Sequence, residues 1–147
     1  MKSFLKIKSV RYSLALLLDD FCKKNGLNSP HKMQSIFNDH IPFGEWLNKI
    51  KEISEQYPKA GLGLEIGSIV QAKHIGIVAY IAQSCDTFSD YIEILSKYER
   101  LWFNYIPKKI NFDEDFFSIS WEKPAYLKAG LYIDETSIVE EMQVSII

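Results

Sequence analysis

Apolar residues recur every three or four positions along most of this chain, which is the spacing that places them on one face of an α-helix. The first such stretch covers residues 10–25, and Gly26 is placed to end it, because glycine readily takes the left-handed conformation found just after a helix. A short second helix is expected over residues 30–40, where Ser29 can cap the first turn. A third helical pattern covers residues 42–57 and ends before a proline.

Two further helices are predicted in the middle of the chain. Residues 74–85 are apolar nearly all round, which indicates a helix in the middle of the core. A buried parallel strand is the alternative, since isoleucine and valine favour strands, but the length of the segment favours the helix. Thr87 and Asp90 then resemble a capping box, and the helix that follows has the clearest apolar stripe in the chain, which extends to Trp102.

Residues 61–67 form a glycine-rich segment ahead of this central region. Gly61, Gly63 and Gly67 lack the spacing of a dinucleotide-binding loop, and the Lys-Ser or Lys-Thr pair of a phosphate-binding loop is absent. We therefore interpret these glycines as places of close backbone approach, or as a helix end, that only small residues permit.

After Trp102 the period changes from helical to alternating, which indicates strands. The predicted segments are a first strand in residues 103–106 and 110–112, a turn in residues 113–115 and a second strand in residues 116–122. Residues 125–133 are ambiguous, and residues 136–147 begin a last helix. The predicted fold class is α+β, mostly helical with a small antiparallel β-hairpin or sheet in the C-terminal third, in a single domain over residues 1–147.

The composition fits one folded domain with a core of its own. The chain has 147 residues, of which 47% are hydrophobic, enough to fill an ordinary core. Its formal charge is −2, so it lacks the positive field with which nucleic-acid-binding proteins gather phosphates. Cys22 and Cys85 lie in apolar helical patterns, where a free thiol behaves as a small hydrophobic side chain. This cysteine usage suits the reducing cytoplasm.

The start of the chain imitates a secretory signal without matching one. Residues 12–18 are mostly apolar and follow several lysines, but Asp19 and Asp20 interrupt the run, and the same residues fit an amphipathic helix. No stretch approaches the roughly 18 to 20 apolar residues that span a bilayer. We therefore expect a cytoplasmic protein with no membrane partner.

No residues form a recognisable catalytic or metal-binding motif. His31, His40 and His74 do not have the spacing that puts two ligands on one helical face, and no nucleophile elbow or kinase motif is present. We expect a protein that is not an enzyme and that uses no cofactor or metal.

Aromatic side chains with a polar tip are the candidate ligand-binding residues, because such rings suit a mostly apolar pocket with a few orienting hydrogen bonds. The candidates are Tyr80, Tyr91, Tyr98, Trp102 and Trp121. A packed aromatic core between the central helices and the hairpin is the alternative interpretation of the same residues.

Four short motifs between Leu62 and Trp102 have the order and spacing of a known family. They are Gly63-Leu64-Glu65-Ile66-Gly67, His74-Ile75-Gly76-Ile77-Val78-Ala79-Tyr80, Ser84-Cys85-Asp86-Thr87-Phe88-Ser89-Asp90-Tyr91 and Tyr98-Glu99-Arg100-Leu101. This run resembles the N-terminal arabinose-binding-type domain of AraC-family transcription regulators, in the subgroup similar to ornithine-utilisation regulators. The resemblance covers residues 10–121. Val78 departs from the pattern, where a second glycine is usual, and Asp86 stands where proline is common.

The resemblance implies the ligand-sensing and dimerising domain of a bacterial DNA-binding transcription regulator. Such a domain takes a small-molecule effector, here of unknown identity, forms a homodimer, and reaches DNA only through C-terminal helix-turn-helix motifs that residues 1–147 do not contain. The effector must favour one of two domain arrangements, because a ligand that binds both equally switches nothing. A ligand-free dimerisation or protein-interaction module is the second hypothesis, and a small enzyme is the third.

Overall fold

The computed structural model describes residues 8–29, 39–102, 108–113, 115–123, 125, 130 and 132–146, with only the backbone described for residues 99–102. The elements in chain order are β1 (Ser9–Arg11), α2 (Tyr12–Asn25), β2 (His40–Pro42), α3 (Phe43–Gln56), α4 (Leu62–Ser68), α5 (Ala72–Ile75), α6 (Ile77–Ser84), α7 (Phe88–Trp102), β3 (Lys108–Phe112), β4 (Phe117–Trp121) and α9 (Ile133–Ile146). This mostly helical α+β architecture confirms the predicted fold class. The predicted helix in residues 30–40 and the strand-like residues 103–106 fall largely or wholly outside the described residues.

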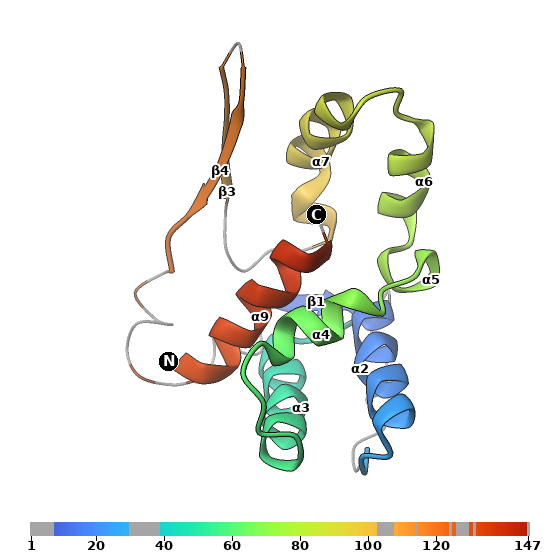
Figure 1. Ribbon diagram of the computed structural model, residues 1–147, viewed down its shortest axis with the longest axis vertical. Coiled ribbons are helices and arrows are strands. Elements are labelled where there is room, and N and C mark those ends of the chain that lie inside the picture. Colours follow the sequence, from blue (N-terminus) through green and yellow to red (C-terminus); the bar gives the residue numbers. More distant parts are fainter. Residues whose placement is uncertain are drawn as a thin grey trace.

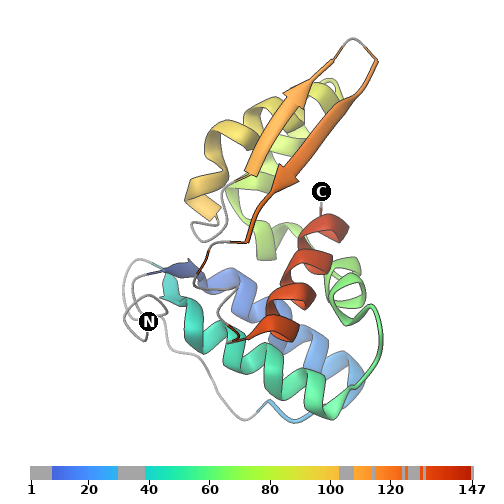
Figure 2. The same cartoon turned by 90° about the vertical axis from the view of Figure 1, so that its left-hand side faces the viewer.

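The chain folds into a helical body and a second layer that rises from it (Figure 1). In the body α2 and α3 lie side by side, and α4 and α9 pack across them. Its core is built from the apolar stripes of these helices; the largest fully buried side chains are Trp46, Phe21, Phe43, Leu14, Leu17, Leu18, Ile41, Leu47, Ile50, Ile53 and Ile66. Above the body, α6 and α7 form a helical hairpin, and β3 and β4 stand beside α7 (Figure 2).

The two helices of the body end close to where the sequence predicts, but the predicted start of the first helix at residue 10 is wrong, because Ser9–Arg11 form strand β1 and α2 begins at Tyr12. Gly26 follows α2 with a φ of 65°. The N–H of Gly26 donates to the carbonyl of Lys23 at 3.4 Å and the N–H of Leu27 donates to the carbonyl of Cys22 at 2.9 Å, so two of the last carbonyls of α2 have partners in this turn. Pro42 precedes α3, where its missing N–H costs nothing. One feature was not predicted: β1 pairs with β2, with Val10 opposite Ile41. Strands of three residues are too short to produce a visible alternation.

The glycine-rich segment is a helix that lies against α9 at very short range. A Cβ atom added at Gly63 would lie 2.1 Å from the carbonyl oxygen of Ile138, and one added at Gly67 would lie 2.6 Å from the Cβ of Ser145. The interpretation of these glycines as places of close backbone approach is therefore confirmed. The N–H of Gly63 also donates to the carboxylate of Glu141 at 3.0 Å.

The prediction of one continuous helix over residues 74–85 in the middle of the core is wrong. Gly76 adopts φ 56° and ψ −126°, a conformation open to glycine alone, and divides the segment into α5 and α6. α6 buries Val78 and Ala79 but leaves Ile77 and Tyr80 exposed. The apolar residues of this segment therefore do not all face the core, because those on one side of α6 are exposed to solvent.

The start of α7 and the C-terminal hairpin form as predicted. The hydroxyl of Thr87 accepts the N–H of Asp90 at 3.1 Å, and the Asp90 carboxylate accepts the N–H of Thr87 at 3.2 Å, so the capping box is confirmed. β3 and β4 are antiparallel, with Ile110 opposite Ile119. None of the described helices is long and apolar enough to cross a membrane.

Candidate functional site

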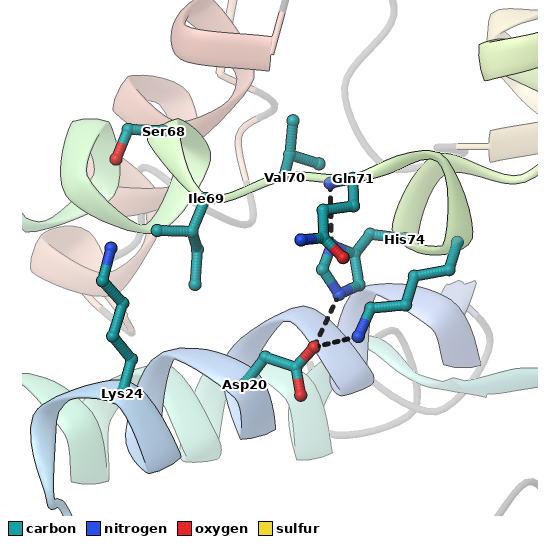
Figure 3. Close-up of a pocket in the computed structure, with 8 residues that line it drawn as sticks. Asp20, Lys24, Ser68, Ile69, Val70, Gln71 and His74 are labelled. Carbon is teal, nitrogen blue, oxygen red and sulfur yellow. Dashed lines mark hydrogen bonds and ion pairs between the residues drawn. The ribbon is translucent and has the colours of Figure 1, made fainter.

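A pocket of about 400 Å³ lies between α2 and the segment that joins α4 to α5 (Figure 3). The lining residues are Asp20 and Lys24 from α2, and Ser68, Ile69, Val70, Gln71, Lys73 and His74 from the opposite segment. Asp20 and Lys24 reach the same side of the pocket because residues four apart share a face of a helix. The pocket is open to solvent and its lining is mainly polar.

His74 is the buried polar residue of this pocket, with 1% of its side chain exposed. Its Nδ1 accepts the backbone N–H of Gln71 at 3.0 Å, across the first turn of α5. Because a backbone N–H can only donate, the ring proton is on Nε2, which lies 3.1 Å from Oδ2 of Asp20 and donates to it. Both ring nitrogens are therefore occupied.

Asp20 receives a second interaction from the ammonium group of Lys73 at the same oxygen. The hydrogen bond from Lys73, followed by that from His74, holds the pKa of the Asp20 carboxyl below its usual value of 3.8. The carboxylate stays ionised at neutral pH. The Asp20–Lys73–His74 cluster thus ties α5 to α2, in the manner of a structural clamp.

This arrangement limits the chemistry open to the pocket. An aspartate bonded to a histidine is the geometry expected of a general base, but a base needs a free ring nitrogen, and neither nitrogen of His74 is free. The same occupancy prevents His74 from ligating a metal. Among the described residues, no three or more His, Cys, Asp or Glu side chains gather as a metal site.

The two cysteines do not add a nucleophile to the described part of the chain. Both are free thiols, and burial raises the pKa of Cys22, which keeps it in the unreactive thiol form. Cys85 lies after α6, where its Sγ is 3.1 Å from the carbonyl oxygen of Ile81 and donates weakly to it.

The sequence-predicted ligand residues are distributed over the second layer. Tyr80 on α6 and Tyr98 on α7 have 72% and 48% of their surface exposed, so both rings lie largely in solvent. Tyr91 is buried on α7, and burial raises its pKa. Trp121 at the end of β4 is half-buried and its Nε1 donates to Glu140 on α9 at 3.1 Å. The side chain of Trp102 lies outside the described residues.

Aromatic rings join α7 to the hairpin. The ring of Phe88 lies 6.0 Å from that of Tyr91 and 5.6 Å from that of Phe117, and Phe117 lies 6.4 Å from Phe112. Phe88 and Phe112 are about half exposed. We call these four residues the hairpin aromatic cluster. Of the predicted ligand residues it contains Tyr91, which is linked to the hairpin through Phe88, while Trp121 lies on the same face of β4 as Phe117.

The Asp20–Lys73–His74 cluster was missed from the sequence. In the sequence, Asp19 and Asp20 stand out only because they interrupt an apolar run. Two acids beside buried positions of a helix are a usable clue, because each needs a cationic partner: Asp19 pairs with the buried Lys49 of α3, and Asp20 pairs with α5.

No protein-family model, no characterised protein and no solved structure matches this chain.

Proposed function

We propose that this chain is the effector-sensing and dimerising domain of an AraC-type transcription regulator, which controls a helix-turn-helix domain outside residues 1–147. The observation that carries the proposal is the ordered run of motifs between Leu62 and Trp102, which combines the Gly63–Gly67 spacing, the stretch ending at Tyr80 and the Thr87 cap. We also propose a cytoplasmic location, which suits two free thiols.

The exposed apolar side chains of the second layer support this proposal. Ile77 and Tyr80 on α6, and Phe88 and Tyr98 on α7, have about half or more of their surface in contact with solvent. Large apolar groups left exposed on neighbouring elements are typical of surfaces that bind a ligand or a partner protein. Tyrosine also offers a hydroxyl that can orient a small molecule.

A sensing domain needs an element with two arrangements, and the link between α5 and α6 is suited to this role. The Asp20–His74 contact holds α5 on the body, whereas α6 begins only after Gly76. A glycine at such a junction can change its backbone angles at low cost. An effector that contacts α6 or α7 in only one arrangement would shift the equilibrium between the two.

The test is a thermal-shift screen of the purified chain against amino acids, polyamines, sugars, fatty acids and aromatic acids, because selective binding to the folded state raises the apparent stability. We expect a saturable rise in Tm for one chemical class. The variant Tyr80→Ala should reduce that rise, and the variant Lys23→Ala, at an exposed position of α2, is the matched control that should retain it.

The second candidate function is a dimerisation or protein-interaction module that binds no ligand. The observation that favours it is the high exposure of Tyr80 and Tyr98, the two rings that were expected to border a ligand cavity. Flat melting curves for every chemical class, together with a dimeric mass by light scattering, would replace the sensing function by this one.

A further inference from the structure

The outer edge of β4 has a regular set of backbone groups that point away from β3. The N–H of Asp113 donates to the carbonyl of Phe116 at 2.8 Å, which makes these two residues a hydrogen-bonded pair. From this pair onward, hydrogen-bonded and non-hydrogen-bonded pairs alternate along the hairpin. By this alternation Asn111 bonds Ser118, and the N–H and C=O groups of Phe117, Ile119 and Trp121 face outward. Within the described part of the chain, no third strand pairs with that edge.

This edge also lacks the features that normally prevent strand pairing. β3 carries Lys108 and Lys109, and charged residues protect an exposed edge. β4 has the sequence Phe-Ser-Ile-Ser-Trp, without a charge, a proline or a glycine. The hairpin contacts α7 through β3 and through the rings of Phe88 and Phe117, and Figure 2 shows it in front of α7, with no ribbon along the outer side of β4.

We propose that a second copy of this chain pairs with β4, antiparallel and about a two-fold axis at Ile119, to form a four-stranded sheet. The inference rests on the proposed function and gives its dimer contact a place. In this register Ile119 lies opposite its own equivalent and Phe117 lies opposite Trp121 of the second copy. All outward groups of the three residues find partners, about six hydrogen bonds in total.

The side chains on both faces agree with this register. Residues directly opposite each other in an antiparallel pair share a face, so the apolar face of one hairpin continues into that of the other, and Ser118 lies opposite Ser120 on the polar face. Just beyond the strand, Asp115 lies opposite Lys123 of the second copy, on both sides of the axis. A shift of two residues in either direction loses both the Asp115–Lys123 pairing and part of the backbone bonding.

Lys123 can make this contact without losing its own. It already pairs with Glu140 at 3.1 Å, and an ammonium group has three donors. Within one chain Asp115 and Lys123 are separated by an extended segment of roughly 25 Å. Any coupling between these two residues must therefore come from two different copies.

The first test is a mixed disulfide experiment with two differently tagged full chains, Ser118→Cys and Ser120→Cys, both exposed positions. Opposed residues of this kind have Cα atoms about 4.5 Å apart, which a disulfide can bridge. We expect the mixed disulfide to form at least about tenfold faster than either homodisulfide, whereas Asn111→Cys on the exposed face of β3 should give no preferred partner. Unmodified chain measures the background from the native thiols.

The second test reverses the two charges and measures the dimer dissociation constant by sedimentation. Asp115→Lys and Lys123→Asp should each raise the Kd by about tenfold, because each contact occurs twice. The double variant should dimerise more tightly than Lys123→Asp alone, since both variants lose the Lys123–Glu140 pair within one chain and only the double variant restores the pairing between copies.

The outcomes separate the interface from the proposed function. A preferred mixed disulfide with charge rescue supports the β4 interface. A dimer with statistical disulfides and no rescue overturns this interface and leaves dimerisation in place. A chain that stays monomeric at high concentration overturns both the interface and the dimerising role, while the thermal-shift screen still decides the sensing role.

Discussion

Gly63→Ala tests the close contact between α4 and α9. The added Cβ would lie 2.1 Å from the carbonyl oxygen of Ile138, 2.6 Å from the Cβ of Glu141 and 2.9 Å from the N of Met142. The shortest of these distances is about 1.3 Å below the 3.4 Å at which ordinary van der Waals contact begins. Two of the three atoms belong to the backbone, so no side-chain rotation relieves the overlap and α9 itself must move away.

The expected loss is a balance of two effects. Alanine improves helix propensity by about 1 kcal/mol, whereas overpacking against a fixed backbone costs about 3 kcal/mol or more. Moving α9 also uncovers Val139 and Met142, which are fully buried. We expect the free energy of unfolding to fall by about 2 kcal/mol, which lowers the Tm by roughly 7 °C for a chain of this size.

Urea denaturation followed by far-UV circular dichroism measures this loss, with a matched series at the second glycine. In Gly67→Ala the crowding atoms are the Cβ and Oγ of Ser145, at 2.6 and 2.8 Å, and one carbonyl oxygen, so Ser145→Gly should recover part of the stability. The same second substitution should not rescue Gly63→Ala. A Gly63→Ala variant that is more stable than the original chain would refute the close approach of α4 and α9.

The remaining predictions concern the ion pairs and the link at Gly76. Asp19→Asn removes the carboxylate that pairs with the ammonium of Lys49, which is 2% exposed, and should lower the unfolding free energy by about 2 kcal/mol in urea denaturation, whereas Glu93→Gln, in an exposed pair with Lys97, should leave it nearly unchanged. Gly76→Ala meets no neighbour within 4 Å but is strained at φ 56°, so it should lower the unfolding free energy by about 2 kcal/mol without a steric clash; an unchanged Tm would contradict the strain. The pKa of Asp20 is lowered in the folded state, so the contribution of Asp20 to the free energy of unfolding is present above about pH 3.8 and is lost as the pH falls below that value. Asp20→Asn should therefore flatten the acid side of a plot of Tm against pH.

Local features of the fold could be predicted because neighbouring residues carry the information. The Thr87–Asp90 cap and the end of α2 at Gly26 depend on residues within one helical turn. The hairpin register follows from a period of two and a short turn. The break at Gly76 could not be predicted, because a single glycine in an apolar stretch is compatible with a continuous helix.

The candidate site could not be predicted, because its contacts join distant segments. Asp20 and His74 are 54 residues apart, and they meet only because α5 packs on α2. Tyr80 and Tyr98 show the opposite difficulty, since an apolar stripe specifies that a face is covered but not whether the cover is this chain or another molecule.

On the proposed function, one acidic residue connects the second layer to α9. Glu140 on α9 accepts the Nε1–H of Trp121 at 3.1 Å and pairs with Lys123 at 3.1 Å. Both partners of Glu140 lie at the base of the hairpin. A dimer contact along β4 would hold the hairpin, while α4 holds α9 through Gly63. An effector on α6 or α7 could then change the position of α9 only if its contacts differ between two hairpin arrangements, because coupling between sites requires differential binding energy.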